Sequence, residues 1–259
     1  MDLGLADRVY VVTGGSKGLG HATAAALVAD GAKVVLASRD AANVEAAVER
    51  LSAPVGAPPA EGWGSVTGVA ADLADPEAAE RLARTALERY GRLDGALISV
   101  GGPPPGTAAS ATDEQWRAAF ESVFLGSVRA VRTLAGRLTG DGAIGMVLST
   151  SVRQPVGGLG ISNGLRPGLA MVAKDMADEF GPRGVRVLGL LPGRIATDRM
   201  TQLDAAFPDA RAAAVAGIPL GRYGEPAEFG RAAAFLLSPA ASYITGSVIA
   251  VDGGSLRAI

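Results

Sequence analysis

The stretch "RVYVVTGGSKGLGHATAAALVADG" (residues 8–31) decides the fold. Its first part, residues 8–14, is an apolar and β-branched run that predicts a buried strand. Its last part, residues 20–31, is rich in alanine and ends at a glycine, which predicts a helix. The stretch "TGGSKGLG" (13–20) joins the two, and its glycines let the backbone turn tightly and approach a pyrophosphate. The helix that follows would offer free N–H groups and the positive end of its dipole to such an anion.

Strands and helices of the same kind alternate along the rest of the chain. Further strands are expected at 33–40, 65–73, 93–102, 143–151, 185–193 and 246–254. Helices are expected at 41–52, 76–91, about 113–138, near 165–181 and near 226–237. Continuously apolar strands that alternate with helices indicate a parallel sheet covered on both faces. The predicted fold class is therefore α/β, a doubly wound parallel sheet of the Rossmann type with about seven strands.

Two segments interrupt this alternation. Residues 53–64 are rich in proline and glycine, which is typical of an excursion on the surface. Residues 198–224 mix apolar and charged residues and contain two prolines. We predict that this second segment is a lid over the substrate, although a helical insertion that only packs would have the same pattern. No repeat or low-complexity linker divides the chain, so residues 1–259 are expected to form a single domain.

Composition narrows the classes of function. Hydrophobic residues make up 48% of the chain and charged residues 19%, which suffices for a substantial core. The net charge of −2 and the lack of a basic run favour a small-molecule substrate over nucleic acid. The chain has no cysteine, which excludes disulfides, and no cluster of metal ligands is evident. With neither a signal peptide nor a long apolar span in the sequence, we expect a cytoplasmic protein without a membrane partner.

The end of the second expected strand predicts the cofactor. An acidic residue at this point would bind the ribose 2′-hydroxyl of NAD, whereas a basic residue accommodates the 2′-phosphate of NADP. Here the strand ends in Ser38 and Arg39, and Lys17 stands in the glycine-rich loop. Each cation alone could be an ordinary surface residue, but their joint placement favours NADP(H).

These motifs resemble those of the short-chain dehydrogenase/reductase family, in its classical 3-oxoacyl-reductase-like branch. "TGGSKGLG" matches the TGxxxGxG loop of that family, and "PGRIATD" (192–198) matches its PGxIxT loop. "ADLAD" carries Asp72 where the family contacts adenine, and "LGRYGEPAE" (220–228) and "SYITGSVIAVDGG" (242–254) look like its C-terminal signatures. The resemblance implies a homotetramer or homodimer. It also implies that NADP(H) is bound by Thr13, Gly14, Ser16, Lys17, Gly18, Leu19, Gly20, Ser38, Arg39, Asp72, Leu73, Ser99, Gly101, Arg166, Pro192, Gly193, Ile195 and Thr197.

The chain departs from the family pattern at the position of the chemistry. The family normally uses Asn, Ser, Tyr and Lys, with the Tyr and the Lys four residues apart. Matching the flanking segments places Val123, Ser151, Ser162 and Arg166 at these four positions. No tyrosine anywhere in the chain has a lysine four residues after it. The tyrosines are Tyr10, Tyr90, Tyr223 and Tyr243, and the residues four positions later are Gly14, Asp94, Ala227 and Ser247.

The replacing residues limit the chemistry. A serine hydroxyl is a far weaker acid than a phenol, so Ser162 is not expected to ionise near neutral pH. Arg166 stays charged and could bind ribose hydroxyls or phosphate, or stabilise an oxyanion. Ser151 could donate a hydrogen bond to a carbonyl, and Arg153 could bind an acidic substrate. Two simpler interpretations remain open: Ser162 and Asn163 could only cap the next helix, and Arg153 could be a surface or interface cation.

Three functions are compatible with these residues. The first is an NADP(H)-dependent oxidoreductase with an atypical site, which transfers a hydride to or from a carbonyl, a quinone or an activated enone. The second is a non-redox enzyme on the same scaffold, such as an isomerase, lyase or cyclase. The third is a non-catalytic subunit that binds NADP. We favour the first, with Ser151, Ser162, Arg166 and Arg153 as candidate catalytic residues, and we expect no metal.

Overall fold

The sheet follows the predicted topology. The computed structural model describes residues 1–53, 62–206 and 208–258. In these ranges seven strands form one sheet in the order β3-β2-β1-β4-β5-β6-β7, and every neighbouring pair is parallel. The strands are β1 (Val9–Thr13), β2 (Lys33–Ser38), β3 (Ser65–Ala70), β4 (Gly95–Ile98), β5 (Gly142–Val147), β6 (Val185–Pro192) and β7 (Val248–Val251). The chain moves outward in one direction from β1 and in the other from β4, so their carboxyl ends flank the crevice where such sheets bind ligands.

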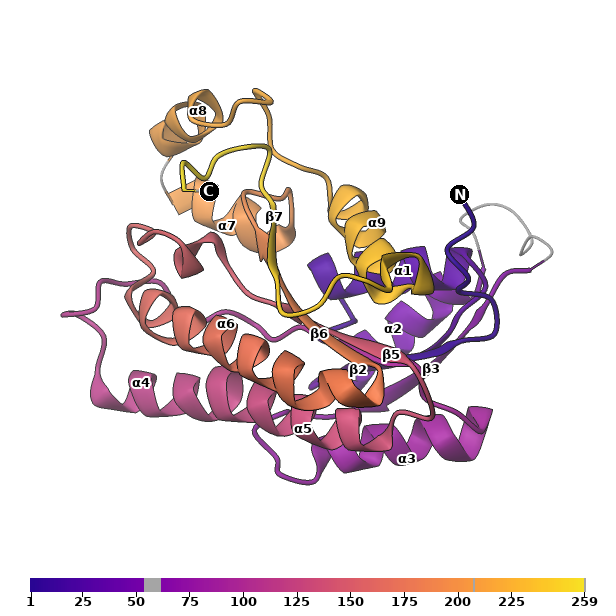
Figure 1. Cartoon of the computed structure of the whole chain (residues 1–259). Helices are drawn as coiled ribbons and strands as arrows, with labels where there is room; N and C mark the ends of the chain where they lie inside the picture. The colour runs from indigo at the N-terminus through magenta and orange to yellow at the C-terminus, as the bar shows by residue number, and fades with distance from the viewer. Residues whose placement is uncertain (54–61, 207, 259) are drawn as a thin grey trace.

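Helices cover both faces of the sheet (Figure 1). One layer consists of α1 (Gly18–Ala29), α2 (Ala41–Ser52) and α9 (Pro226–Leu237), which share a hydrophobic cluster with the strands. The other consists of α3 (Ala78–Tyr90), α5 (Gly126–Arg137) and α6 (Gly160–Phe180), which share a second cluster. The α/β fold class predicted from the alternation of strands and helices is therefore confirmed.

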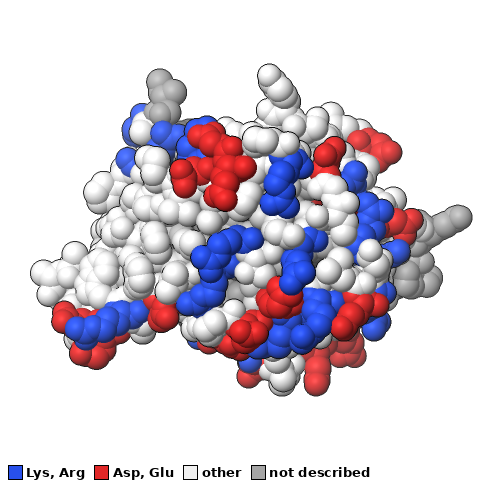
Figure 2. Space-filling view, turned by 60° about the horizontal axis from the view of Figure 1, so that its bottom comes forward, with Lys and Arg blue, Asp and Glu red and all other residues white. Residues whose placement is uncertain are grey.

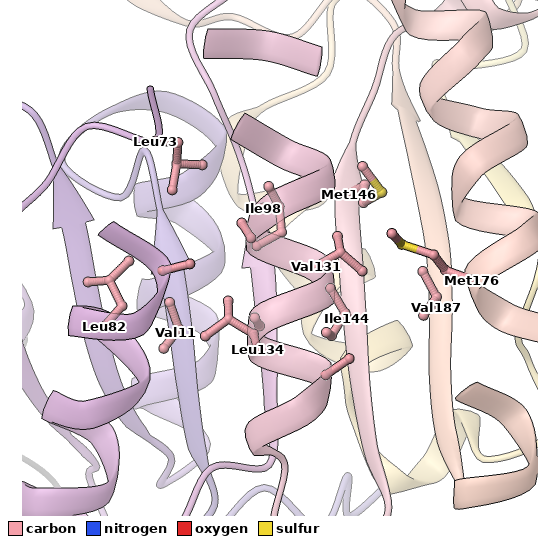
Figure 3. Close-up of a cluster of buried hydrophobic side chains, with 14 of the residues drawn as sticks. Val11, Leu73, Leu82, Ile98, Val131, Leu134, Ile144, Met146, Met176 and Val187 are labelled. Carbon is pink, nitrogen blue, oxygen red and sulfur yellow. The ribbon is translucent and has the colours of Figure 1, made fainter. Parts of the chain in front are cut away.

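The second cluster shows why the strands read as continuous apolar runs. Ile98 and Ile144 point from β4 and β5 toward Val131 and Leu134 of α5, and Met176 of α6 packs beside them (Figure 3). The alternate residues of the same strands face the opposite helical layer, so both sets of side chains are buried. This sandwich makes the carboxyl edge of the sheet a rigid base for the loops that follow each strand.

The long helix expected at about 113–138 is interrupted. It consists of α4 (Asp113–Ala119), a π-helical segment (Phe120–Leu125) and α5, without a break in the chain direction. Thr112 begins α4 with a capping box to Gln115. Wide turns of this kind occur frequently at functional sites. Val123 lies in the π-helical segment and is buried.

Two of the expected elements have bounds that differ clearly from the structure. The strand expected at 93–102 is limited to β4, so Ser99 and the glycines and prolines after it form a loop. The helix expected near 165–181 begins at Gly160, five residues earlier. Gly160 donates its N–H to the carbonyl of Gly106 at 2.9 Å, so a contact between two distant loops fixes the start of this helix.

The segment 198–224 contains two short helices, α7 (Asp198–Ala206) and α8 (Pro208–Ala216). They lie outside the two helical layers, next to the C-terminal end of the chain (Figure 1). Of the expected surface excursion at 53–64, residues 54–61 lie outside the described residues. Within the ranges that the structure describes, no helix is both long and apolar enough to cross a bilayer.

Candidate functional site

The glycine-rich loop after β1 leaves no room for a side chain at Gly14 or Gly20. Gly14 has a φ of +58°, and a Cβ there would lie 2.6 Å from the carbonyl oxygen of Ser99. A Cβ on Gly20 would lie 2.4 Å from the carbonyl oxygen of Gly14. Because both contacts are with backbone, neither neighbour can move aside without shifting the loop. The loop therefore presents bare backbone to the crevice, as a pyrophosphate requires.

Hydroxyl groups join the loop to the neighbouring strands. Thr13 Oγ1 donates to the carbonyl oxygen of Ser99 at 2.9 Å and accepts from the Ser99 N–H at 2.9 Å. Ser16 Oγ donates to Ser38 Oγ, also at 2.9 Å. These bonds join, in two pairs, four residues that the sequence predicted as cofactor contacts, from β1, the loop after it, β2 and the loop after β4.

The N-terminus of α1 is open toward the crevice. Lys17 is the N-cap residue, its side chain makes no capping bond, and the first turn carries no acidic residue. Arg50 reaches across from α2 and donates to the carbonyl oxygen of Ser16 at 3.1 Å. His21 Nδ1 lies 3.3 Å from the carbonyl oxygen of Gly15, and burial together with the charge of Arg50 lowers the pKa of this histidine. Free N–H groups and surrounding cations suit a phosphate group.

The loop after β6 lies over the glycine-rich loop. A Cβ on Gly18 would lie 3.7 Å from Thr197 Cγ2, so these two predicted cofactor residues face each other. Gly193 fits against the C-terminal segment, because a Cβ there would lie 2.7 Å from the Cα atom of Asp252. Ile195 pairs with Gly224 in an isolated parallel bridge. The PGRIAT segment is thus held between the glycine-rich loop and the C-terminal part of the chain.

The remaining predicted cofactor residues lie around the same edge. Asp72 forms a turn after β3 by accepting the Ala74 N–H at 3.0 Å, and Leu73 is buried. Arg39 is exposed at the end of β2, as Lys17 is in the loop. A Cβ on Gly101 would meet nothing within 4 Å, so open space rather than crowding surrounds this residue. The loops, the bare backbone and the exposed cations fit a dinucleotide cofactor of the NAD(P) type.

Two buried serines form the centre of the second half of the site. Ser151 lies in a short 3-10 helix (Thr150–Val152) after β5, and Ser162 lies in the first turn of α6. Their Oγ atoms are 3.4 Å apart, and both residues are less than a tenth exposed. Either hydroxyl can donate to the other, which leaves one proton of the pair for an oxygen in the crevice.

Arg166 lies one turn after Ser162 on α6. Its Nη1 donates to the carbonyl oxygen of Val147, the last residue of β5, at 2.6 Å. Burial, and to a lesser extent the nearby charge of Arg199, lower the pKa of Arg166 to about 10. The guanidinium therefore remains charged at neutral pH at the carboxyl edge of the sheet, where the sequence placed it.

Backbone contacts fix the loop between the two serines. Asn163 accepts the Val156 N–H and donates to the Val156 carbonyl oxygen, both at 3.0 Å. The N-cap residue of α6 is Leu159, without a side-chain bond. The interpretation of Ser162 and Asn163 as a capping pair is therefore wrong, because both lie inside the helix and bond elsewhere.

Two further arginines, Arg153 and Arg199, lie near this part of the site, and they differ in their contacts. Arg153 is exposed at the end of the 3-10 helix that carries Ser151. Arg199, in the first turn of α7, donates to the carbonyl oxygens of Gly102 at 3.0 Å and Pro103 at 2.9 Å. Sequence reasoning missed Arg199 and Arg50, since each acts on a segment far away along the chain and no local motif marks it.

Comparison with known proteins agrees with this geometry. The profile of enoyl-(acyl carrier protein) reductases matches residues 14–255. Levodione reductase of Leifsonia aquatica is 32% identical over 265 residues, which cover 97% of this chain and 95% of that protein. Dehydrogenase/reductase SDR family member 4 of Oryctolagus cuniculus is 33% identical over 261 residues, covering 97% and 94% of the two chains. The chain belongs to the short-chain dehydrogenase/reductase family.

The solved structures support the same assignment. L-sorbose reductase from Gluconobacter frateurii, in complex with NADPH and L-sorbose, superposes with a TM-score of 0.90 at 29% identity and full coverage of both chains. As a member of this family, the protein is an NAD(P)-dependent oxidoreductase. Because these relatives are named for different substrates, similarity to them does not identify the substrate of this protein.

Proposed function

We propose that this protein is an NADP(H)-dependent oxidoreductase with an atypical active site, in which Ser151, Ser162 and Arg166 act on a carbonyl, quinone or activated enone. The observation that carries this proposal is the buried pair of hydroxyls, 3.4 Å apart, one helical turn from a charged guanidinium. All three side chains gather at the carboxyl edge of β5, beside the loops that fit the cofactor. Arg153 remains a candidate for contacts with substrate at the exposed rim.

Bound NADPH would supply a hydride to the substrate carbon. The chain's own residues would then have to stabilise the negative charge on the substrate oxygen. One hydroxyl of the pair Ser151 and Ser162 donates a hydrogen bond to that oxygen while the other hydroxyl donates to its partner, and Arg166 provides a fixed positive charge at a buried position. Because neither serine ionises near neutral pH, the proton comes from water. Substrates that need little help from an acid, such as quinones and activated enones, suit this arrangement.

The preference for NADP(H) over NAD(H) rests on Lys17, Ser38 and Arg39. Both cations are exposed at the edge of the crevice, and Ser38 is tied to the glycine-rich loop through Ser16. A 2′-phosphate would gain charge-assisted hydrogen bonds from this group, whereas a 2′-hydroxyl would not.

Cofactor titration followed by a substrate screen tests the proposal. NADPH and NADH are titrated by the change in their fluorescence, and NADPH consumption is then followed at its absorbance band with ketones, quinones and enones. We expect tighter binding of NADPH and turnover with at least one class that is lost in Arg166→Ala. Substrate conversion without any change in cofactor redox state would instead identify a non-redox enzyme. Cofactor binding without any conversion would indicate a non-catalytic subunit.

The lid function of residues 198–224 is part of this proposal. Its first turn is already attached to the crevice, because Arg199 bonds to the loop that contains Gly102 and Pro103. Its last residue is attached to the loop after β6, because Gly224 donates its N–H to the carbonyl oxygen of Arg194 at 3.0 Å. A segment fixed at both ends beside the crevice can cover a bound substrate.

We also propose that the protein is a homotetramer or homodimer. A groove of about 420 Å³ lies between α4 and α6, lined by Trp116, Arg117, Phe120, Glu121 and Leu165. Phe120 is 45% exposed and Met171 on α6 is 71% exposed. The face made by the lower helices of Figure 1 carries charges of both signs around a broad area without charged side chains (Figure 2). Light scattering coupled to gel filtration tests this state, and Phe120→Glu should shift it toward monomer.

A further inference from the structure

Arg166 differs from the other deeply buried arginine of the fold. Arg186 on β6 is 8% exposed and donates to three backbone carbonyls. These carbonyls belong to Leu236 at 2.8 Å, Ser238 at 2.8 Å and Ile244 at 3.2 Å. Arg166 is only 5% exposed, yet it donates to a single carbonyl. A guanidinium carries five N–H donors. Most of the hydrogen-bonding capacity of Arg186 is therefore used by backbone carbonyls, whereas most N–H donors of Arg166 have no acceptor within the described ranges of the chain.

The unused donors of Arg166 face accessible space. Among the described residues, no fully buried side-chain nitrogen or oxygen lacks a hydrogen-bond partner. The nitrogens of Arg166 that have no partner are therefore not fully buried, although the residue as a whole nearly is. They must reach the small accessible part of this side chain, at the carboxyl edge of the sheet beside Val147.

Arg199 adds a second positive charge to the same part of the crevice. It approaches from α7 and is close enough to Arg166 to lower the pKa of that residue. Its own hydrogen bonds go to two backbone carbonyls. In the part of the chain that the structure describes, no ion pair joins either arginine to a carboxylate. The crevice thus holds two cations whose charges the fold does not neutralise.

A nearly dry guanidinium without a counter-ion is costly, and a carboxylate is its best geometric match. We propose that the site takes a substrate with a carboxylate close to the carbonyl that is reduced, of which 2-oxo acids are the simplest class. Arg166 binds the carboxylate, Arg199 adds to the attraction, and the serine pair holds the carbonyl oxygen. The inference rests on the proposed redox function for the reaction. A 2-oxo acid, NADPH and one proton from water give a 2-hydroxy acid and NADP⁺, and the carboxylate is unchanged.

Matched ligands test the charge requirement without turnover. Benzoylformate and its methyl ester have the same ketone and ring but differ by one negative charge. Each is titrated calorimetrically into the protein with saturating NADP⁺, which cannot reduce the ketone, and into the protein without cofactor. We expect the acid to bind roughly 10- to 100-fold more tightly than the ester, as charged hydrogen bonds of this kind allow.

Variants test whether the preference for the acid comes from Arg166 and Arg199 rather than from any buried arginine. Arg166→Gln should abolish the preference for the acid, and Arg166→Lys should retain part of it as a point charge. Arg199→Gln, at a partly exposed residue, should reduce the preference several-fold and serves if Arg166→Gln does not fold. Arg186→Gln is the matched control, because it removes a buried guanidinium elsewhere and should leave the preference unchanged.

The outcomes distinguish this inference from the proposed function. Equal affinities for acid and ester, or no binding of the acid in either state, would overturn the carboxylate inference even if neutral ketones are reduced. A preference that depends on Arg166, together with NADPH oxidation by benzoylformate, supports both. The same preference without NADPH oxidation by any carbonyl would support the carboxylate site and overturn the redox function.

Discussion

The two halves of the crevice are built in different ways. The cofactor half, around β1, β2 and the loop after β6, relies on bare backbone and on glycines that no other residue can replace. The other half, around β5 and α6, relies on the side chains of Ser151, Ser162 and Arg166. Backbone geometry restricts the sequence tightly, whereas side chains can be exchanged one at a time on an unchanged frame. By its resemblance the chain keeps the family's cofactor loop, and we propose that Ser162 and Arg166 stand where the family places its proton donor and its lysine.

Removing a hydroxyl from the side-chain half should have the largest effect. Ser151→Ala is expected to lower kcat roughly 100- to 1,000-fold, as the loss of one donor to a developing oxyanion does. NADPH affinity should stay within a factor of two or so, because Ser151 is not part of the cofactor half. Steady-state kinetics with the best substrate of the screen, together with fluorescence titration of NADPH, measure both quantities.

Ser122→Ala is the control for this experiment. Its hydroxyl donates to the carbonyl oxygen of Ala118 on an exposed helical surface, so its removal should change neither quantity. An unchanged kcat in Ser151→Ala would show that the serine pair is structural. The side-chain half of the crevice would then not act on the substrate through these hydroxyls.

Adding one methyl group to the backbone half should break cofactor binding. In Gly20→Ala the new Cβ would lie 2.4 Å from the carbonyl oxygen of Gly14, so α1 and the loop must separate. We expect NADPH affinity to fall on the order of 100-fold, about 2.7 kcal/mol, from a loop that no longer fits the pyrophosphate.

The matched control is Gly136→Ala, also a helical glycine. A Cβ at Gly136 would meet nothing within 4 Å, so this variant should bind NADPH normally and gain about 0.5–1 kcal/mol of stability. If Gly20→Ala bound NADPH as well as the parent protein, the steric account of the cofactor half would be wrong.

Cofactor discrimination should respond to a smaller change. Arg39→Ala removes an exposed cation at the end of β2, and we expect NADPH to bind about 10-fold more weakly while NADH is unaffected. Arg132→Ala removes an exposed cation from α5 in the opposite helical layer and should alter neither affinity. Equal losses for NADPH and NADH in Arg39→Ala would mean that Arg39 does not distinguish the 2′-phosphate.

The same contrast explains how far the sequence alone could go. The helix at 41–52 was predicted to the residue and the helix near 226–237 was predicted closely, because a periodic pattern and local caps define them. A glycine loop between a strand and a helix is likewise a local signal, and the structure places this loop between β1 and α1. The start of α6 was misplaced because it depends on Gly106, whose backbone lies far away in sequence.

Long side chains were the second source of error. Arg199 and Arg50 each reach a backbone carbonyl in another loop, and no spacing in the sequence reveals such a contact. The π-helical turn that carries Val123 also escaped prediction, because it keeps the helical direction and changes the apolar period only locally. Sequence reasoning therefore named candidate site residues but not the contacts that orient them.

The smallest expected effect concerns His21, in the first turn of α1 after the glycine-rich loop. Burial and the charge of Arg50 lower the pKa of His21 below its ordinary value of 6.5, so the unfolded chain binds a proton more readily than the folded protein. The stability that His21 contributes is therefore complete above about pH 6.5 and is lost as the pH falls below that value. Because the residue is only partly buried, the loss should stay below about 1 kcal/mol.

Urea unfolding of the parent protein and of His21→Asn, at pH 7.5 and at pH 5.5, measures this loss of stability. The variant should lose less stability than the parent protein on acidification. An equal loss in both proteins would show that protonation of His21 does not contribute to the pH dependence of stability. Bound NADPH should not remove the difference if the histidine supports the loop through Gly15 rather than through the cofactor.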